Sequence, residues 1–90
     1  MTKDSLLKTL NLYEHVLKSA EVKIQEASFR KHYKTDKQST LEHCHSMINQ
    51  IRTFVANDNM DKAWRWLGFL QGCFWTLGLF SLNELREHNS

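Results

Sequence analysis

Apolar residues recur at alternating steps of three and four through three long segments of this chain, and no proline interrupts any of them. That spacing places apolar side chains on one face of an α-helix, whereas a proline would break the helix interior. The sequence holds only three glycines, which disfavours a turn-rich β fold. We therefore predict an all-α protein, a small bundle of three main helices plus a short C-terminal helix, in a single domain over residues 1–90.

The first helix is predicted from about Ser5 to Tyr33. Its apolar positions follow a heptad pattern: Leu6, Leu10, Tyr13, Leu17, Ala20, Ile24 and Ala27. So long a helix needs a partner along its seam, within the chain or in a second copy. A chain of 90 residues buries only about 60–65% of its surface by itself. We therefore expect a homo-oligomer.

Capping signals set the start of the second helix. Ser39 and Glu42 have the spacing of a capping box, which predicts that this helix begins at Thr40. Its apolar stripe runs through Leu41, Cys44, Ile48, Ile51 and Val55. The polar residues 57–59 have turn chemistry and are expected to end it.

The third helix is predicted over Asp61–Leu77, with Gly78 suited to the left-handed position just beyond its end. Ser81 and Glu84 again have capping-box spacing, so a short last helix is predicted from Leu82 to about His88.

This third helix carries two unusual faces. At about 100° per residue, one continuous arc is entirely apolar and is the predicted core face: Ala63, Trp66, Leu67, Leu70, Cys73, Phe74 and Leu77. The opposite side gathers Trp64, Gly68, Gln71, Gly72 and Trp75, with Arg65 at its edge. Each glycine costs about 1 kcal/mol relative to alanine in a helix interior. Something is therefore expected to approach the backbone there.

Two interpretations of the glycine face stay open. The more ordinary one is close helix–helix packing, in which small residues let two backbones approach. The other is a site for a flat, anionic ligand. In that site Trp64 or Trp75 would stack on a base, Gln71 would bond to its edge, and Arg65 would pair with phosphate. Both can hold together, because pockets are common at oligomer interfaces.

Further candidates lie upstream. Residues 29–34 mix cations with aromatics at the end of the first predicted helix, where basic groups complement the helix dipole. Arg30 and Lys34 are candidates for additional phosphate contacts. His43 is a candidate polar residue facing the pocket. His43 and His45 would point about 200° apart on a helix, and no second ligand pair follows at zinc-site spacing, so no metal site is predicted.

Enzyme motifs are missing from the sequence. It shows no glycine-rich phosphate loop after a strand and no nucleophile elbow, so we predict neither catalytic residues nor a cofactor. Glu84 and Glu87 form one ExxE pair, which an all-helical nucleotide pyrophosphatase would complement with a second acidic pair. The second helix offers only Glu42 for that purpose.

Net charge and hydropathy exclude some classes of binding partner. A formal charge of +2 is too small for binding duplex nucleic acid. The apolar run Trp66–Phe80 is shorter than a membrane span and includes Gln71, so no membrane insertion is expected. Cys44 and Cys73 lie in apolar helical surroundings and no signal peptide precedes them, which favours reduced thiols in a cytoplasmic protein.

The stretch Lys62-Ala-Trp-Arg-Trp-Leu-Gly-Phe-Leu-Gln-Gly-Cys-Phe-Trp75, with Glu84-Leu-Arg-Glu-His-Asn89 after it, resembles a group of small tailed-phage proteins. These share the signature K-A-x-R-W-L-G-F-x-Q-G-x-x-W and are functionally uncharacterised. The resemblance covers about residues 43–89. It implies that the motif positions are Lys62, Arg65, Gly68, Gln71, Gly72 and Trp75.

A phage setting implies binding rather than catalysis, because small accessory phage proteins commonly disarm host processes by binding. The leading hypothesis is a homo-oligomeric anti-defence protein in the host cytoplasm. It would sequester a small anionic ligand, most plausibly a nucleotide immune signal. The alternative is a protein–protein inhibitor whose same face docks on a host enzyme or regulator.

Overall fold

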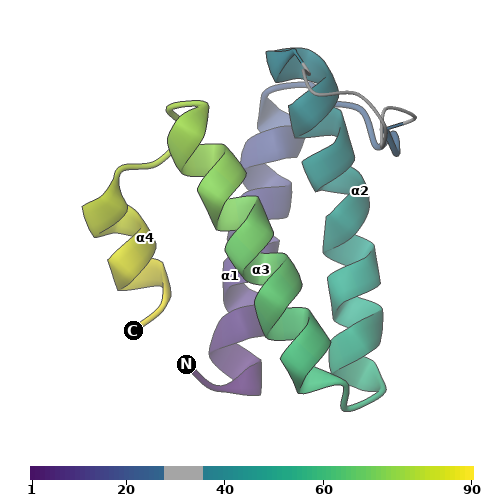
Figure 1. Ribbon diagram of the computed structural model, residues 1–90, viewed down its shortest axis with the longest axis vertical. Coiled ribbons are helices and arrows are strands. Elements are labelled where there is room, and N and C mark those ends of the chain that lie inside the picture. The colour runs from purple at the N-terminus through teal and green to yellow at the C-terminus, as the bar shows by residue number, and fades with distance from the viewer. Residues whose placement is uncertain (28–35) are drawn as a thin grey trace.

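The computed structural model describes residues 1–27 and 36–90, and within these ranges the chain forms helices and no strand. The helices are α1 (Lys3–Ser19), α2 (Lys37–Ala56), α3 (Met60–Thr76) and α4 (Leu82–His88). Figure 1 shows α1, α2 and α3 running alternately up and down as a bundle, with the short α4 on the side of α3 away from α2. The predicted all-α bundle of three main helices and one short one is confirmed.

Helix α1 is much shorter than predicted. It ends at Ser19, so the expected continuation to Tyr33 is wrong over residues 20–27, and residues 28–33 of that prediction lie outside the described part of the chain. The heptad pattern fails at the same point, because Ala20 is exposed and Ile24 is 58% exposed.

Tertiary hydrogen bonds explain this departure from the heptad pattern. Beyond α1 the backbone runs without regular structure through residues 22–27 and bonds to α2 instead of to itself. The Val22 carbonyl accepts a hydrogen bond from Nδ1 of the buried His45 at 2.9 Å. The Gln25 amide donates to the Glu42 carbonyl at 3.4 Å. Side chains and carbonyls of α2 therefore replace the helical bonds that α1 would have continued to make.

Three helices end in the same way, with one residue in the left-handed conformation just past the helix. These residues are Glu21 (φ 58°), Asp58 (φ 58°) and Gly78 (φ 77°), and only the glycine was predicted from the sequence. In each case the next amide reaches back five residues, which is the Schellman pattern. The bonds are Val22 N to Leu17 O at 2.9 Å, Asn59 N to Phe54 O at 2.8 Å and Leu79 N to Phe74 O at 2.8 Å.

Helix α2 begins three residues before the predicted Thr40. Its N-cap is Asp36, whose carboxylate accepts a hydrogen bond from the Ser39 amide at 2.7 Å. The expected capping role of Ser39 is therefore wrong. At α4 the predicted capping box is confirmed, because the Glu84 amide donates to Ser81 Oγ at 3.1 Å and the Ser81 amide donates to Glu84 Oε1 at 3.0 Å.

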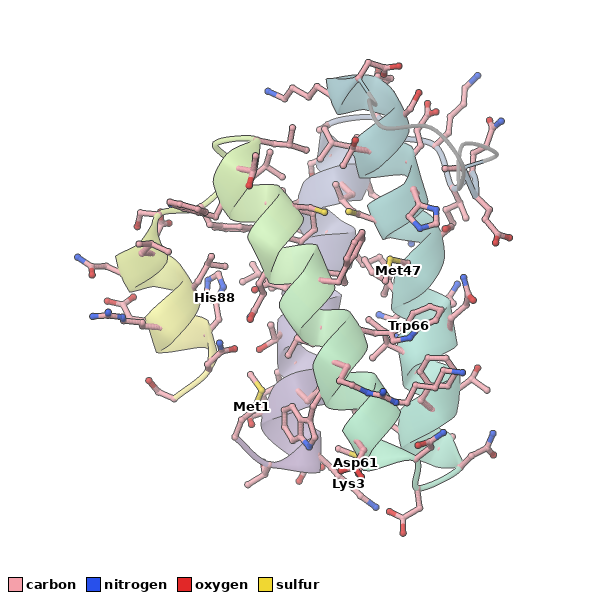
Figure 2. All side chains as sticks on the ribbon, viewed as in Figure 1. Met1, Lys3, Met47, Asp61, Trp66 and His88 are labelled. Atoms are coloured by element: carbon pink, nitrogen blue, oxygen red, sulfur yellow. The ribbon has the colours of Figure 1, made fainter. Side chains whose placement is uncertain are left out.

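The core lies where the three main helices meet. The predicted stripe of α2 is buried throughout, and the predicted core face of α3 is buried at four positions: Ala63, Leu67, Leu70 and Phe74. Trp66, Cys73 and Leu77 pack at its margin, and Trp66 reaches over α2 (Figure 2). Within the described residues, no helix is both long and apolar enough to cross a membrane.

Candidate functional site

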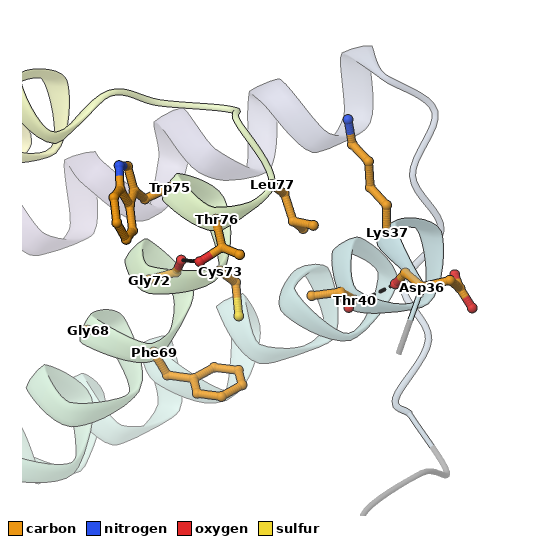
Figure 3. Close-up of a pocket in the computed structure, with 10 residues that line it drawn as sticks. All are labelled: Asp36, Lys37, Thr40, Gly68, Phe69, Gly72, Cys73, Trp75, Thr76 and Leu77. Carbon is orange, nitrogen blue, oxygen red and sulfur yellow. Dashed lines mark hydrogen bonds between the residues drawn. The ribbon is translucent and has the colours of Figure 1, made fainter. Parts of the chain in front are cut away.

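The glycine face of α3 is an open groove in the folded chain. A Cβ placed on Gly68 or Gly72 would meet no atom within 4 Å among the described residues. No other described helix therefore covers this stretch of backbone. We call the surrounding depression, of about 590 Å³, the α3 groove. It is formed by Gly68, Phe69, Gly72, Cys73, Trp75 and Leu77 together with the start of α2 (Figure 3).

Aromatic side chains border the α3 groove. Phe69 and Trp75 are each 53% exposed, which is unusual for rings of this size on a folded chain. Phe69 points toward α2 and Trp75 lies on the other side of the glycines (Figure 3). The backbone of Gly72 is therefore accessible between two half-exposed rings. The Gly72 carbonyl also accepts a hydrogen bond from Thr76 Oγ1 at 2.9 Å.

Charges of both signs stand at one end of the groove. Lys37 and Asp36 come from the start of α2. The backbone and side chain of Ser39 bond to the Asp36 carboxylate and lower its pKa. One lysine and one aspartate give this end a polar margin with little net charge, which is a weaker site for phosphate than a cluster of cations.

The predicted ligand-binding residues do not share one site but line separate depressions of the surface. Gly68, Gly72 and Trp75 line the α3 groove. Trp64 and Gln71 line a smaller hollow of about 290 Å³, which Gly68 also borders. Arg65 is exposed in a third, shallow depression beside Trp64 and donates from Nε to the Asp61 carbonyl at 3.4 Å. The structure thus places Arg65 and Trp75 in different depressions.

Gln71 has a structural role. Its side chain is only 8% exposed, and its Nε2 donates to Tyr13 Oη at 3.0 Å and to Asn89 Oδ1 at 2.7 Å. Its Oε1 accepts from Asn89 Nδ2 at 3.0 Å. Both ends of the amide are thereby engaged.

The network continues to α4. Tyr13 Oη lies 2.9 Å from Nδ1 of His88, and His88 points from α4 toward the bundle (Figure 2). Burial raises the pKa of Tyr13, and the hydrogen bond from Gln71 partly offsets this. The network joins α1, α3 and α4, and sequence reasoning missed it. A single glutamine inside the apolar run was the available signal.

The remaining upstream candidates lie near the margin of the groove or outside the described residues. His43 is half-buried, accepts a hydrogen bond from the Ala27 amide at Nδ1 (3.1 Å), and meets the Phe69 ring edge-on with 6.4 Å between centroids. It joins residues 22–27 to α2 next to the groove. Arg30 and Lys34 lie outside the described part of the chain, so their phosphate contacts stay a prediction.

Lys62, the first residue of the motif K-A-x-R-W-L-G-F, also packs within the chain. Its ammonium lies 4.7 Å from the centre of the Phe54 ring and 5.7 Å from that of Trp66, as in a cation–π contact. Lys62 and Gln71 thus have structural partners within the chain, whereas Gly68 and Gly72 have no packing partner within reach among the described residues.

Comparisons of the chain with protein-family models, with curated proteins and with solved structures found no match.

Proposed function

We propose that this protein acts by binding, as an inhibitor-type partner of another protein, and that the α3 groove receives an amphipathic helix of that partner. The observation that carries the proposal is the open backbone at Gly68 and Gly72 between the half-exposed rings of Phe69 and Trp75. The phage-type setting rests on the resemblance of the motif. This choice favours the second of the two functions that the sequence suggests.

The energetics support a helix as the occupant. Two glycines four residues apart cost about 2 kcal/mol in an isolated helix, and no contact within the described chain offsets that cost. A helix crossing at this point could approach the α3 backbone closely, because no Cβ stands in its way. This is the kind of contact that a pair of small residues permits.

The rings add the second contribution. A fully buried Phe or Trp removes about 150–250 Å² from water, and both rings are 53% exposed here. Covering the exposed half of each removes about 100 Å² of apolar surface, or roughly 2–3 kcal/mol per ring at about 25 cal/mol per Å². Contributions of that size are typical of the few residues that dominate a protein interface. Lys37 and Asp36 would lie at the polar rim.

A capture experiment with matched variants tests the proposal. The full chain, immobilised, is incubated with bacterial host lysate in parallel with the Gly68→Ala/Gly72→Ala variant, Trp75→Ala and the control Leu82→Ala. Leu82 is 52% exposed but does not line the groove. We expect one stoichiometric partner that the control retains and the two groove variants lose. A captured set that is the same for all four proteins contradicts the proposal.

Sequestration of a flat anionic ligand is the second candidate. Its support is that Lys37 and the rings of Phe69 and Trp75 border one groove, so that stacking and a cation are available together. Calorimetry against cyclic nucleotides and ADP-ribose derivatives tests it. Heat that disappears in Trp75→Ala and persists in Leu82→Ala would favour this candidate over the first. The absence of heat throughout the panel would remove it.

A further inference from the structure

Two histidines of α2 bond to the segment that follows α1, residues 22–27, which we call the connector. Nδ1 of His45 lies 2.9 Å from the Val22 carbonyl oxygen. Nδ1 of His43 accepts a hydrogen bond from the Ala27 amide at 3.1 Å. One histidine therefore holds the first residue of the connector and the other holds its last.

Apolar burial holds the connector only at its first residue. Val22 is 7% exposed and belongs to the core, whereas Ile24 is 58% exposed. The Gln25 amide reaches the Glu42 carbonyl at 3.4 Å, beyond the usual range of N–H···O distances. The bond from Ala27 to His43 is therefore an important attachment of the connector beyond Val22.

The two neutral rings must carry their protons on opposite nitrogens. A carbonyl oxygen only accepts, so Nδ1 of His45 carries the proton that it donates to Val22. A backbone amide only donates, so Nδ1 of His43 is the bare nitrogen and the proton lies on Nε2. Each bond thus fixes one tautomer of its ring.

A second proton on either ring disturbs this arrangement. On His43 it would go to Nδ1, where it would face the Ala27 amide, and two N–H donors cannot bond to each other. On His45 it would go to Nε2, which is buried and has no hydrogen-bond partner among the described residues. A buried N–H without an acceptor is costly, and more so when it is charged. His45 is only 3% exposed, so its ring could hydrate this group only by moving out and breaking the bond to Val22.

The charged groups around the two rings do not supply the missing acceptor. From α1, Glu14 interacts electrostatically with His45, but its carboxylate is bonded to Arg52 at 2.7 Å. That bond lowers the pKa of Glu14, which therefore stays ionised while histidines titrate. From α3, the uncharged ring of Phe69 meets His43. The remaining charged side chains next to these groups are Lys18, which pairs with Glu14 at 3.7 Å, and, along the chain, Lys23, Glu26 and Glu42.

We propose that His43 and His45 form a pH-sensitive latch, which holds the connector on α2 near neutral pH and releases it in mild acid. Histidine is the side chain whose charge ordinarily changes between about pH 5 and 8. A proton that binds only to the released form shifts the balance toward release as the pH falls. For an ordinary imidazole pKa of about 6.5, lowering the pH from about 7.5 to about 5.5 increases the opening constant about tenfold for one such proton and about a hundredfold for two.

This inference is independent of the proposed binding function, because it needs no partner. Long-range proton–nitrogen NMR correlations on the full chain at neutral pH report which nitrogen of each ring carries the proton. We expect the proton on Nε2 of His43 and on Nδ1 of His45. Any other assignment, or a charged ring at neutral pH, overturns the proposal.

Amide hydrogen exchange, corrected for its intrinsic pH dependence, measures the release itself. Between the same two pH values, the protection of the Gln25 and Ala27 amides should fall at least tenfold, while the amides inside α3 stay protected. Unchanged protection at Gln25 and Ala27 overturns the proposal. So does a loss of protection in α3 in the same step, because the whole bundle would then be unfolding.

Matched variants assign the pH dependence to the latch. His43→Asn offers the Ala27 amide a carbonyl oxygen that does not titrate, so Ala27 should stay protected and about tenfold of the pH effect should disappear. The control His15→Asn replaces an exposed histidine of α1 and should leave the pH effect unchanged. A pH effect that persists in full in His43→Asn, or that disappears in His15→Asn, contradicts the proposal. Should His43→Asn fail to fold, the ring assignments and the wild-type exchange decide the question.

Discussion

Replacing Gly68 and Gly72 by alanine should stabilise the isolated chain. Both residues lie in the interior of α3, where alanine is favoured over glycine by about 1 kcal/mol per position. In the part of the chain that the structure describes, the new methyl groups meet no neighbouring atom within 4 Å, so no steric cost reduces this gain. The double variant should therefore be about 2 kcal/mol more stable. Each kcal/mol raises the Tm of a domain of this size by about 4–8 °C.

Gly78 provides an internal control, because its replacement by alanine should change the stability in the opposite direction. The space around its Cβ position is equally open, but its φ is +77°, which L-residues rarely adopt. Gly78→Ala should therefore lower the free energy of unfolding by about 1–2 kcal/mol. Urea denaturation followed by circular dichroism, on dilute protein, measures all the variants in one assay.

A destabilised Gly68→Ala/Gly72→Ala variant would refute this reasoning, because it would mean that the glycines already pack against something in solution. Repeating the denaturation across a range of protein concentrations would then identify a second copy of the chain as that neighbour. Stabilisation combined with loss of the captured partner is the result that the proposed binding function requires.

Three further predictions concern the bundle itself. Gln71→Leu should cost about 2–3 kcal/mol in urea denaturation, because it leaves the Asn89 amide and the Tyr13 hydroxyl without their buried partner; equal stability would mean that water replaces the amide. Glu21→Gly should stabilise the chain by about 1 kcal/mol, because glycine adopts the φ of 58° without strain, and an unchanged denaturation midpoint would argue against that strain. Arg52 lowers the pKa of Glu14 through a 2.7 Å bond, so this pair contributes stability above the unfolded-state pKa of Glu14. That contribution is lost as the pH falls through the lower folded-state pKa, and Glu14→Gln should remove this part of the acid dependence in denaturation curves.

The apolar periodicity of the sequence predicted the helices that bury one face in the three-helix core. The stripe of α2 is buried at every position that the three-and-four spacing predicts, and the core face of α3 is buried at four of its seven predicted positions. The first helix was overestimated because Ile24 and Ala27 continue a heptad that the backbone does not follow. Residues 22–27 bond to α2, and contacts between distant segments cannot be read from local spacing.

The glycines of the α3 groove could be singled out from the sequence, whereas the structural role of Gln71 could not. A helical wheel places Gly68, Gly72 and Gln71 on the same side of α3, and the structure shows the glycines open and Gln71 buried. The difference arises from α4. The capping box predicts that α4 forms, but the sequence of this seven-residue helix does not predict where it packs on the bundle. Asn89, just past its end, then occupies the amide that looked available for a ligand.

The network at Gln71 also sets how firmly the C-terminus is held. Within α4 itself only Leu85 is buried, and the rest of its attachment includes polar bonds from His88 and Asn89 and ring contacts of His88 with Tyr13 and Phe80. Such a segment is expected to open locally more often than the core helices. In the opened form the Gln71 amide would be released next to Trp64, at the smaller hollow. A molecule that captures this amide would select a minor population of the protein, and its apparent affinity would be reduced by the fraction of chains that are open.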